Sequence, residues 1–295
     1  MKENYITQRL ILSRLGLPDA DFIFELLNSP EWIEFIGDRG ITSRAAAEEY
    51  IKKITNDPAC NFWVVKIKDL ETPIGIITFI KRDYLDDYDI GFAFLNKYSK
   101  KGYAMEASAA FLMDQIKIDG RSNILAITTK ANSDSIQLLE KLGMQFSKEL
   151  DRENSSLLVY SLMVDKFLLN ELTRQFFDVF TNANQREPDW ERIYNICLPE
   201  TLIIRKSNVS SDIYNLSSFI EPRKTMLSDG TLTGFEERET FAETKIIGNI
   251  AQRHSGYQKE GYINGVYFKG KGNKFFQFIR TEGCWKINSV IWEDE

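Results

Sequence analysis

The chain has 295 residues, of which 43% are hydrophobic and 27% are charged, a balance that is ordinary for a globular protein folding in water. No apolar run approaches the roughly 20 residues that span a bilayer, and the start MKENYITQRL lacks the apolar core of a signal peptide. The formal net charge of −6 disfavours nucleic-acid or anionic-membrane partners and mildly favours a cationic substrate such as an amine. We therefore expect a cytoplasmic protein that binds neither nucleic acid nor membrane.

The cysteines and the single histidine argue against a metal site or a thiol-based site. Cys60, Cys197 and Cys284 are far apart, odd in number and outside any CxxC pair, so neither a disulfide framework nor a zinc site is predicted. We expect all three to be small buried apolar residues. His254 is the only histidine, and we favour a hydrogen-bonded structural role for it over a pocket-facing one.

Strands and helices alternate through the first half of the chain. Asp19 and Ser43 are candidate N-caps of two helices, and apolar residues recur at helical spacing over 105–116. Gly143 is expected to end a further helix in the left-handed conformation that glycine tolerates. Strands are predicted at 7–15, 61–67, 73–80, 89–94 and 123–129, with a turn near Leu70-Glu71-Thr72 and a closing hairpin around residues 151–154.

The pattern changes near Asp165. An amphipathic helix is predicted at 166–180 and a second short helix after Pro188-Asp189, and strand signals dominate beyond Thr240. Hairpin turns are expected at Lys271-Gly272-Asn273 and at Glu282-Gly283. Helices followed by a run of strands indicate an α+β unit with an antiparallel sheet, so the predicted domains are 1–164 and 165–295.

The stretch from Asp89 to Ala107, DIGFAFLNKYSKKGYAMEA, carries the clearest chemical signal. It predicts a short strand, a basic glycine-containing loop and the start of a helix. Such an arrangement directs free backbone N–H groups and the positive end of a helix dipole at one point, which suits a phosphate-bearing ligand. Gly102 allows close approach of the backbone, and Lys100 and Lys101 add positive charge. The alternative is an ordinary tight turn with solvated lysines.

Several ordered blocks carry a resemblance to a known family: TQRLILSRL at 7–15, PIGIITF at 73–79, DIGFAF at 89–94, KKGYAMEA at 100–107, and Asn132 and Ser135 followed by EKLGM at 140–144. Residues 7–164 resemble the GNAT N-acetyltransferases, and within them the ribosomal-protein-alanine acetyltransferase branch. The resemblance implies an α/β fold with a mixed, mostly antiparallel sheet and flanking helices. It also implies transfer of an acetyl group from acetyl-coenzyme A to a primary amine.

The resemblance implies roles for individual residues as well. Backbone groups near Phe94 and Leu95 would pair with the pantetheine arm of the coenzyme. Asp89 would relay the amine proton through water, or else would be a surface residue at a sheet edge. Ser135 would donate to the sulfur, and Asn132 would contact the coenzyme, cap a helix, or do both. The N–H groups that would hold the pyrophosphate belong to Lys100, Lys101, Gly102, Tyr103, Ala104 and Met105.

Residues 165–295 resemble the NTF2-like, or SnoaL-like, α+β cone domains, whose closing strand is similar to GCWKINSVIWEDE. This implies an accessory domain that binds a small ligand or forms a homodimer. The leading prediction is a cytoplasmic, acetyl-CoA-dependent N-acetyltransferase without a metal. The alternatives are a non-catalytic coenzyme A-binding sensor or interaction protein, and a bifunctional enzyme with chemistry in the cone. The acceptor stays open between an amine-bearing small molecule and a protein N-terminus.

Overall fold

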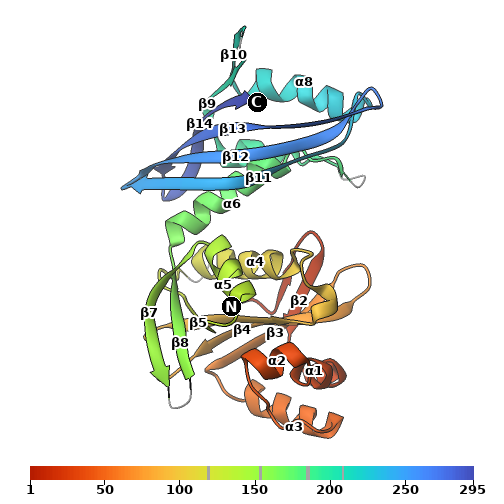
Figure 1. Cartoon of the computed structure of the whole chain (residues 1–295), viewed down its shortest axis with the longest axis vertical. Helices are drawn as coiled ribbons and strands as arrows, with labels where there is room; N and C mark the ends of the chain where they lie inside the picture. Colours follow the sequence, from red (N-terminus) through yellow and green to blue (C-terminus); the bar gives the residue numbers. More distant parts are fainter. Residues whose placement is uncertain (118–119, 153–154, 184–186, 208) are drawn as a thin grey trace. The chain divides into compact units, whose positions relative to one another are not determined.

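The computed structural model describes residues 1–117, 120–152, 155–183, 187–207 and 209–295, which form two compact units, Met1–Phe167 and Leu168–Glu295 (Figure 1). Each unit has its own sheet and its own buried apolar residues. The boundary between the units falls inside helix α6 (Val164–Asp178).

The first unit is built on a mixed sheet of eight strands in the order β1-β2-β3-β4-β5-β6-β8-β7. Strands β5 and β6 run parallel, and the other paired strands run antiparallel. The predicted strands are confirmed, with small shifts at their ends, and residues 153–154 of the predicted closing hairpin lie outside the described residues. The strands are β1 (Asn4–Ile6), β2 (Leu10–Arg14), β3 (Cys60–Ile67), β4 (Thr72–Lys81), β5 (Tyr88–Phe94), β6 (Leu125–Thr129), β7 (Met144–Arg152) and β8 (Ser155–Leu162).

Helices cover both faces of this sheet (Figure 1). On one face lie α1 (Ala20–Leu27), α2 (Pro30–Phe35) and α3 (Arg44–Thr55); on the other lie α4 (Tyr103–Lys117) and α5 (Ser133–Lys141). The single turns η1 (Leu17–Asp19) and η2 (Asn96–Tyr98) precede α1 and α4. Ser43 caps α3 as predicted, because its Oγ accepts the Ala46 N–H. The Asp19 side chain instead accepts the Gly16 N–H, and Gly143 follows α5 with a φ of 87°, as predicted.

Aromatic rings hold α4 against the sheet. Phe111 of α4 lies 4.8 Å from Trp63 of β3 and 5.3 Å from Phe79 of β4, measured between ring centroids. All three side chains are fully buried. Rings packed at such angles gain attraction beyond the area that they bury, so the middle of α4 is held against the strands.

The second unit has a sheet of six strands in the order β10-β9-β14-β13-β12-β11, in which β9 and β14 run parallel. Its helices are α6, α7 (Trp190–Ile196) and α8 (Leu216–Ser228). The two predicted helices are present, but β9, β10 and α8 follow them before the antiparallel strands β11 to β14, and the sequence analysis predicted none of these three elements. The strands are β9 (Cys197–Lys206), β10 (Ser211–Tyr214), β11 (Leu232–Ile247), β12 (Ile250–Ile263), β13 (Val266–Thr281) and β14 (Cys284–Asp294).

The predicted hairpin turn at Lys271-Gly272-Asn273 is wrong, because β13 runs through it without interruption. Gly272 lies opposite Tyr257, and a Cβ atom at Gly272 would lie 2.2 Å from the Glu293 carbonyl oxygen and 2.7 Å from the Tyr257 hydroxyl. This glycine therefore permits a close approach between strands and does not form a turn. The predicted turn at Glu282-Gly283 is confirmed, with φ values of 51° and 79°.

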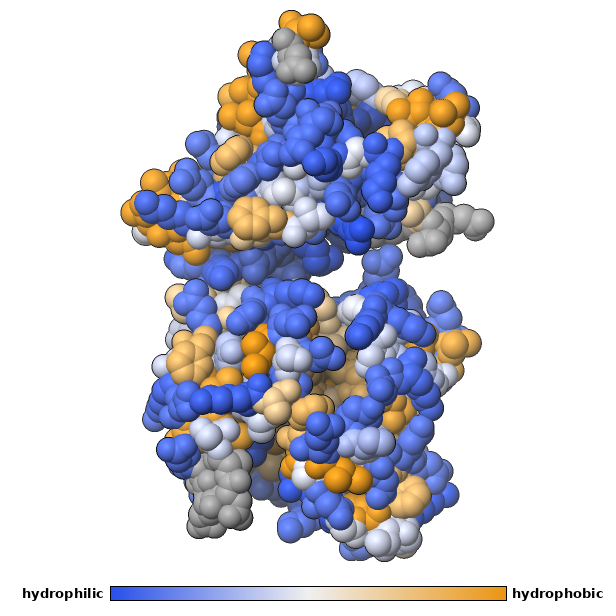
Figure 2. Space-filling view, in the orientation of Figure 1, coloured by the Kyte–Doolittle hydropathy of each residue, from blue (hydrophilic) through white to orange (hydrophobic). Residues whose placement is uncertain are grey.

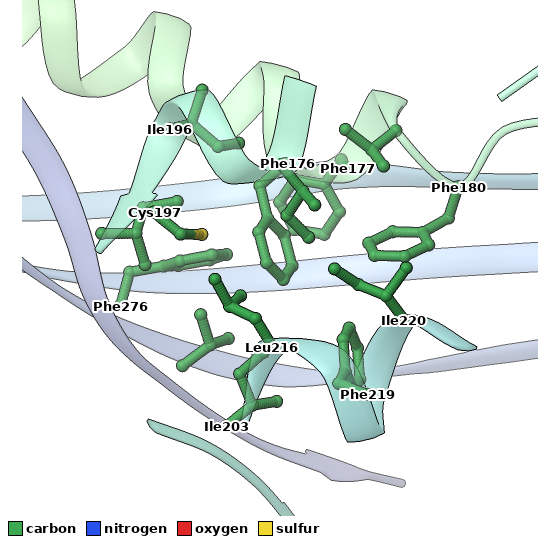
Figure 3. Packing of buried hydrophobic residues seen from close by; sticks show 14 of the residues in the cluster. Phe176, Phe177, Phe180, Ile196, Cys197, Ile203, Leu216, Phe219, Ile220 and Phe276 are labelled. Atoms are coloured by element: carbon green, nitrogen blue, oxygen red, sulfur yellow. The ribbon is translucent and has the colours of Figure 1, made fainter. Parts of the chain in front are cut away.

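Aromatic side chains fill the core of the second unit (Figure 3). Phe176 lies 5.2 Å from Phe276 of β13, and Phe180 lies 5.6 Å from Phe219 of α8, between ring centroids. Buried residues alternate with less buried ones along the middle of β12 and of β13, so the helices pack against one face of the sheet. No helix among the described residues packs against the other face.

Exposed apolar side chains lie at the ends of the long hairpins of this sheet. Ile247 and Ile250 flank the β11–β12 turn with exposed fractions of 60% and 58%, and Val266 starts β13 with 70%. Figure 2 shows hydrophobic patches at both ends of this unit. No helix among the described residues is long and apolar enough to cross a membrane.

The three cysteines are free and differ in exposure. Cys197 is buried, and burial raises the pKa of its thiol to about 12. Cys60 is half-buried, and Cys284 is exposed where β14 begins. The expectation of three buried cysteines is therefore wrong for Cys284, because this residue directly follows the Glu282-Gly283 turn.

A buried ion pair lies beside the aromatic core of the second unit. Lys274 Nζ lies 2.7 Å from Glu237 Oε2, and the two side chains are only 7% and 8% exposed. The Lys274 ammonium also lies 4.4 Å from the centre of the Tyr257 ring. Burial lowers the pKa of Lys274, and the Glu237 carboxylate opposes that shift. Such a pair is costly to break, because removing one partner leaves the other charge buried.

Replacing Glu237 by Gln keeps the side-chain volume but leaves the Lys274 ammonium without its counter-charge. We expect the free energy of unfolding of the second unit to fall by about 3 kcal/mol. The double variant Glu237→Gln/Lys274→Met removes both charges and should recover most of that loss. Hydrogen exchange of the β12 and β13 backbone amides at increasing urea concentration measures both free energies, because the five tryptophans of the chain lie in both units and their fluorescence would not separate the two. Equal losses in the single and double variants would contradict this account.

Candidate functional site

The parallel strands β5 and β6 separate soon after they meet. Their register pair in the described residues joins Asp89 to Leu125, near the start of both strands. Beyond this pair, β5 continues along β4, and β6 continues along β8. The facing edges of residues 90–94 and 126–129 thus leave backbone groups available to a ligand between them. We call this opening the wedge; it widens toward the carboxyl ends of both strands.

Backbone alternation decides which residues of β5 face the wedge. The Leu95 N–H donates to the Ile74 carbonyl at 3.0 Å, so Leu95 directs its backbone toward β4. Successive residues of a strand direct their N–H and C=O groups to opposite sides, so Phe92 and Phe94 direct theirs toward the wedge. Phe94 therefore fits the pairing role implied for it, whereas the Leu95 N–H is already used. The sequence analysis did not single out Phe92.

The loop after β5 presents unpaired donors. Lys100 and Gly102 adopt positive φ values of 59° and 77°, a region that suits glycine and is uncommon for lysine. In the part of the chain that the structure describes, no backbone N–H from Lys100 to Met105 has a hydrogen-bond partner. The side chains of Lys100 and Lys101 are exposed. Unpaired N–H groups at the start of the α4 helix, beside two cations, suit an anion.

The closing block lies at the same edge of the sheet. Because β5 and β6 are parallel, the segments that follow them leave from the same end of the sheet. Asn132 caps α5, since its Oδ1 accepts the Ser135 N–H at 3.0 Å, which confirms the helix-cap prediction. The Ser135 side chain is half-buried on the first turn of α5. The fold therefore brings the loop at 95–105 and the start of α5 to the two sides of the wedge.

Asp89 lies where the wedge closes. Its side chain is buried and is held by Arg82, with Nε 2.7 Å from Oδ1 and Nη2 3.4 Å from Oδ2. Burial raises the pKa of Asp89, and the Arg82 guanidinium opposes that shift. The alternative of a surface aspartate at the sheet edge is wrong, because β5 lies inside the sheet between β4 and β6.

The Asp89 side chain lies on the sheet face opposite α4. Side chains alternate along β5, so Asp89 shares its face with Ala93 and Leu95. Those two residues pack with the apolar residues of α1, α2 and α3. The loop at 99–102 instead leads into α4. The carboxylate and the unpaired N–H groups therefore belong to opposite faces, with the wedge as the passage between them.

The sequence analysis did not identify two arginines that contact residues of the candidate site. Arg9 binds Glu106 and the Lys101 carbonyl, and Arg82 binds Asp89. Arg9 and Glu106 are 97 residues apart, so no local pattern connects them. Arg82 is closer to Asp89, but a lone arginine after a strand is common on protein surfaces.

Metal-ligating clusters and His254 add nothing to this candidate site within the described residues. No cluster of His, Cys, Asp or Glu that could hold a metal ion occurs within the described residues. His254 belongs to the second unit, where Nε2 lies 2.8 Å from Asn273 Oδ1 and the ring stacks on Phe275 with centroids 4.7 Å apart. It is thus hydrogen-bonded on the face without helices, as expected for a structural histidine.

Comparisons with known proteins point to one family for this site. Residues 9–145 match the family model of the acetyltransferase (GNAT) domain. The uncharacterized N-acetyltransferase YnaD of Bacillus subtilis is 29% identical over 47% of this chain and 81% of its own length. The uncharacterized protein YkkB of the same organism is 23% identical over 54% of this chain and 95% of its own.

A solved structure shares the fold of this region. A GCN5-related N-acetyltransferase from Brucella melitensis covers 59% of this chain and 85% of its own, with a TM-score of 0.52 and 16% identity. Residues 9–145, which match the family model, include β5, the loop with Gly102, α4 and the start of α5. The N-terminal half of the chain therefore carries a GNAT acetyltransferase domain.

Proposed function

We propose that the first unit binds acetyl-coenzyme A in the wedge and transfers the acetyl group to a primary amine. The observation that carries this proposal is the set of unpaired N–H groups from Lys100 to Met105 beside the open edge of β5. The pyrophosphate would accept hydrogen bonds from these N–H groups. The pantetheine amides would pair with Phe92 and Phe94 as an added strand does.

The direction of β5 supports one orientation for the proposed ligand. A chain anchored at residues 100–105 and lying along β5 would point its thioester toward Asp89, where the wedge closes. An amine approaching from the α1–α3 face would meet the Asp89 carboxylate. We propose an amine-bearing small molecule or a protein N-terminus as this acceptor, in a cytoplasmic setting without nucleic acid, membrane or metal.

Acetyl transfer requires a neutral amine and a protonated leaving sulfur. Acetyl-coenzyme A supplies the activated acyl group when bound, and a C–N bond forms as the C–S bond breaks. Asp89 would accept, through water, the proton that the amine loses. Its raised pKa suits this role, because a base works best with a pKa near the working pH. Water would supply the proton that the departing thiolate takes up, and Ser135 would donate a hydrogen bond to that sulfur, directly or through water.

A second candidate function is a coenzyme A sensor without catalysis. The observation that favours it is the Asp89–Arg82 pair, which already occupies the carboxylate. α5 also has no tyrosine that could protonate the leaving sulfur. Thiol release from acetyl-coenzyme A in the presence of a panel of amines separates the two functions, because a sensor binds the coenzyme but releases no thiol.

Replacing Gly102 by Val should weaken acetyl-coenzyme A binding at least tenfold, about 1.4 kcal/mol. Valine disfavours the φ of 77°, and a Cβ atom at this position would lie 3.4 Å from Arg9 Nη2, so the loop that carries the N–H groups would have to shift. Isothermal titration calorimetry measures the affinity. Gly248→Val is the matched control, because Gly248 in the β11–β12 turn also has a positive φ, 57°, and a Cβ atom added there would meet nothing within 4 Å. A folded Gly102→Val protein with unchanged affinity for acetyl-coenzyme A would contradict the proposed site.

Asp89→Asn should lower kcat about 10²-fold and leave the acetyl-coenzyme A affinity within about threefold of the wild type. Arg82→Gln is the informative companion, because it keeps the carboxylate but removes the cation that lowers its pKa. A base is active when ionised, so Arg82→Gln should move the acidic limb of the kcat profile to higher pH and spare the rate at alkaline pH. Equal losses in both variants at every pH would reduce Asp89 to a structural partner of Arg82.

We also propose that the second unit is an NTF2-like domain, that the domains are 1–164 and 165–295, and that the helix-free sheet face pairs two copies. Apolar side chains support the pairing: Phe275, Ile291 and Ile213 are 53%, 39% and 68% exposed. Register places them in one row across the sheet, through Ile204. A cavity of about 320 Å³ lined by Ile247, Ile250 and Ile279 supports the alternative of a small ligand.

A fragment of residues 165–295 should fold cooperatively, because it keeps nearly all of α6 and the whole aromatic core. It should bind no coenzyme A and should sediment as a dimer at micromolar concentration. Circular dichroism during heating tests folding, and analytical ultracentrifugation tests association. An unfolded fragment would refute the boundary, and a folded monomer would refute pairing through the sheet.

A further inference from the structure

Arg9 joins the turn between β1 and β2 to the loop that precedes α4. Its Nη1 donates to the Lys101 carbonyl at 2.9 Å, and its Nε donates to Glu106 Oε2 at 2.6 Å. The guanidinium carbon lies 4.7 Å from the centre of the Tyr103 ring. One side chain, remote in sequence, therefore contacts both the loop and the first turn of α4.

Glu106 completes this connection. Its Oε1 accepts the Thr7 hydroxyl at 2.6 Å and the Arg9 N–H at 2.9 Å. Both carboxylate oxygens are thus engaged by the β1–β2 turn. A carboxylate in the first turn of α4 would repel an anion bound at that helix end, and the charge of Arg9 offsets this repulsion.

The contact of Arg9 with the Lys101 carbonyl also fixes the direction of the next N–H group in the loop. The peptide between Lys101 and Gly102 is trans, so its C=O and N–H groups point in opposite directions. Because Arg9 holds the Lys101 carbonyl, the Gly102 N–H is directed away from Arg9. That N–H is among the unpaired donors of the loop. A cation at the carbonyl also polarises the peptide and strengthens its N–H as a donor.

We propose that Arg9 is a positioning residue that directs the Gly102 N–H at the pyrophosphate of the coenzyme and neutralises Glu106 beside it. This inference rests on the proposed binding of acetyl-coenzyme A in the wedge. Arg9 does not need to touch the coenzyme. Its effect is confined to the part of the ligand that carries phosphate.

The test uses the full chain with Arg9→Met and the matched control Arg14→Met. Arg14 lies on β2, donates to Asn61 Oδ1 at 3.0 Å and lies 4.0 Å over the Trp63 ring, away from the loop. Calorimetry with coenzyme A should show about tenfold weaker binding for Arg9→Met, the size of one charge-assisted hydrogen bond, and less than about twofold change for Arg14→Met. Arg9→Met/Glu106→Gln should recover about threefold, because it removes the unpaired carboxylate.

A truncated donor separates positioning from a general structural role. S-Acetylpantetheine lacks the pyrophosphate, so Arg9→Met should leave its kcat/KM unchanged while lowering that of acetyl-coenzyme A about tenfold. Equal losses with both donors would overturn the inference and make Arg9 a stability residue. Wild-type coenzyme affinity in Arg9→Met, with weak binding in Gly102→Val, would overturn the inference alone. A wild-type protein that binds no coenzyme A would overturn the proposed function itself.

Discussion

The candidate site of the first unit depends on the short stretch over which β5 and β6 form backbone hydrogen bonds. Two parallel strands that stayed bonded along their length would satisfy each other's backbone groups and leave no room between them. Here β5 takes its partners from β4 and β6 takes its partners from β8, and the two meet at Asp89 and Leu125. The cost of leaving strand edges unpaired is tolerable only if water or a ligand satisfies them. The wedge therefore leaves backbone groups of the sheet without strand partners, which is why we propose it as the coenzyme site.

Buried charge fixes the geometry of both units. Asp89 and Arg82 lie at the point where the strands separate, and Lys274 and Glu237 join β13 to β11 beside the aromatic core. Neither pair is an efficient source of stability, because removing ions from water offsets much of their attraction. Each pair instead penalises any register in which one partner loses the other. The separation point of β5 and β6 is thus held by a contact that tolerates little displacement.

The sequence analysis predicted the features that depend on residues close together in the chain. Gly102, the lysines beside it and the start of α4 are neighbours in the chain, so their arrangement could be predicted from the order of residues. The role of Asn132 as a helix cap follows from the same short range. Contacts between distant segments could not be predicted, and Arg9 with Glu106 is the clearest case. Gly272 shows a different failure, because a glycine that admits the Tyr257 ring looks the same in sequence as a glycine in a turn.

The unequal exposure of the three cysteines should allow selective chemical labelling of the chain. The Cys197 thiol is buried with a pKa of about 12, and burial also raises the pKa of Cys60, so neither forms the reactive thiolate readily. Cys284 is exposed at the start of β14. A maleimide dye should therefore label the unmutated chain fastest at Cys284, in the second unit. Its fluorescence during coenzyme titration would report whether coenzyme binding changes the surroundings of Cys284.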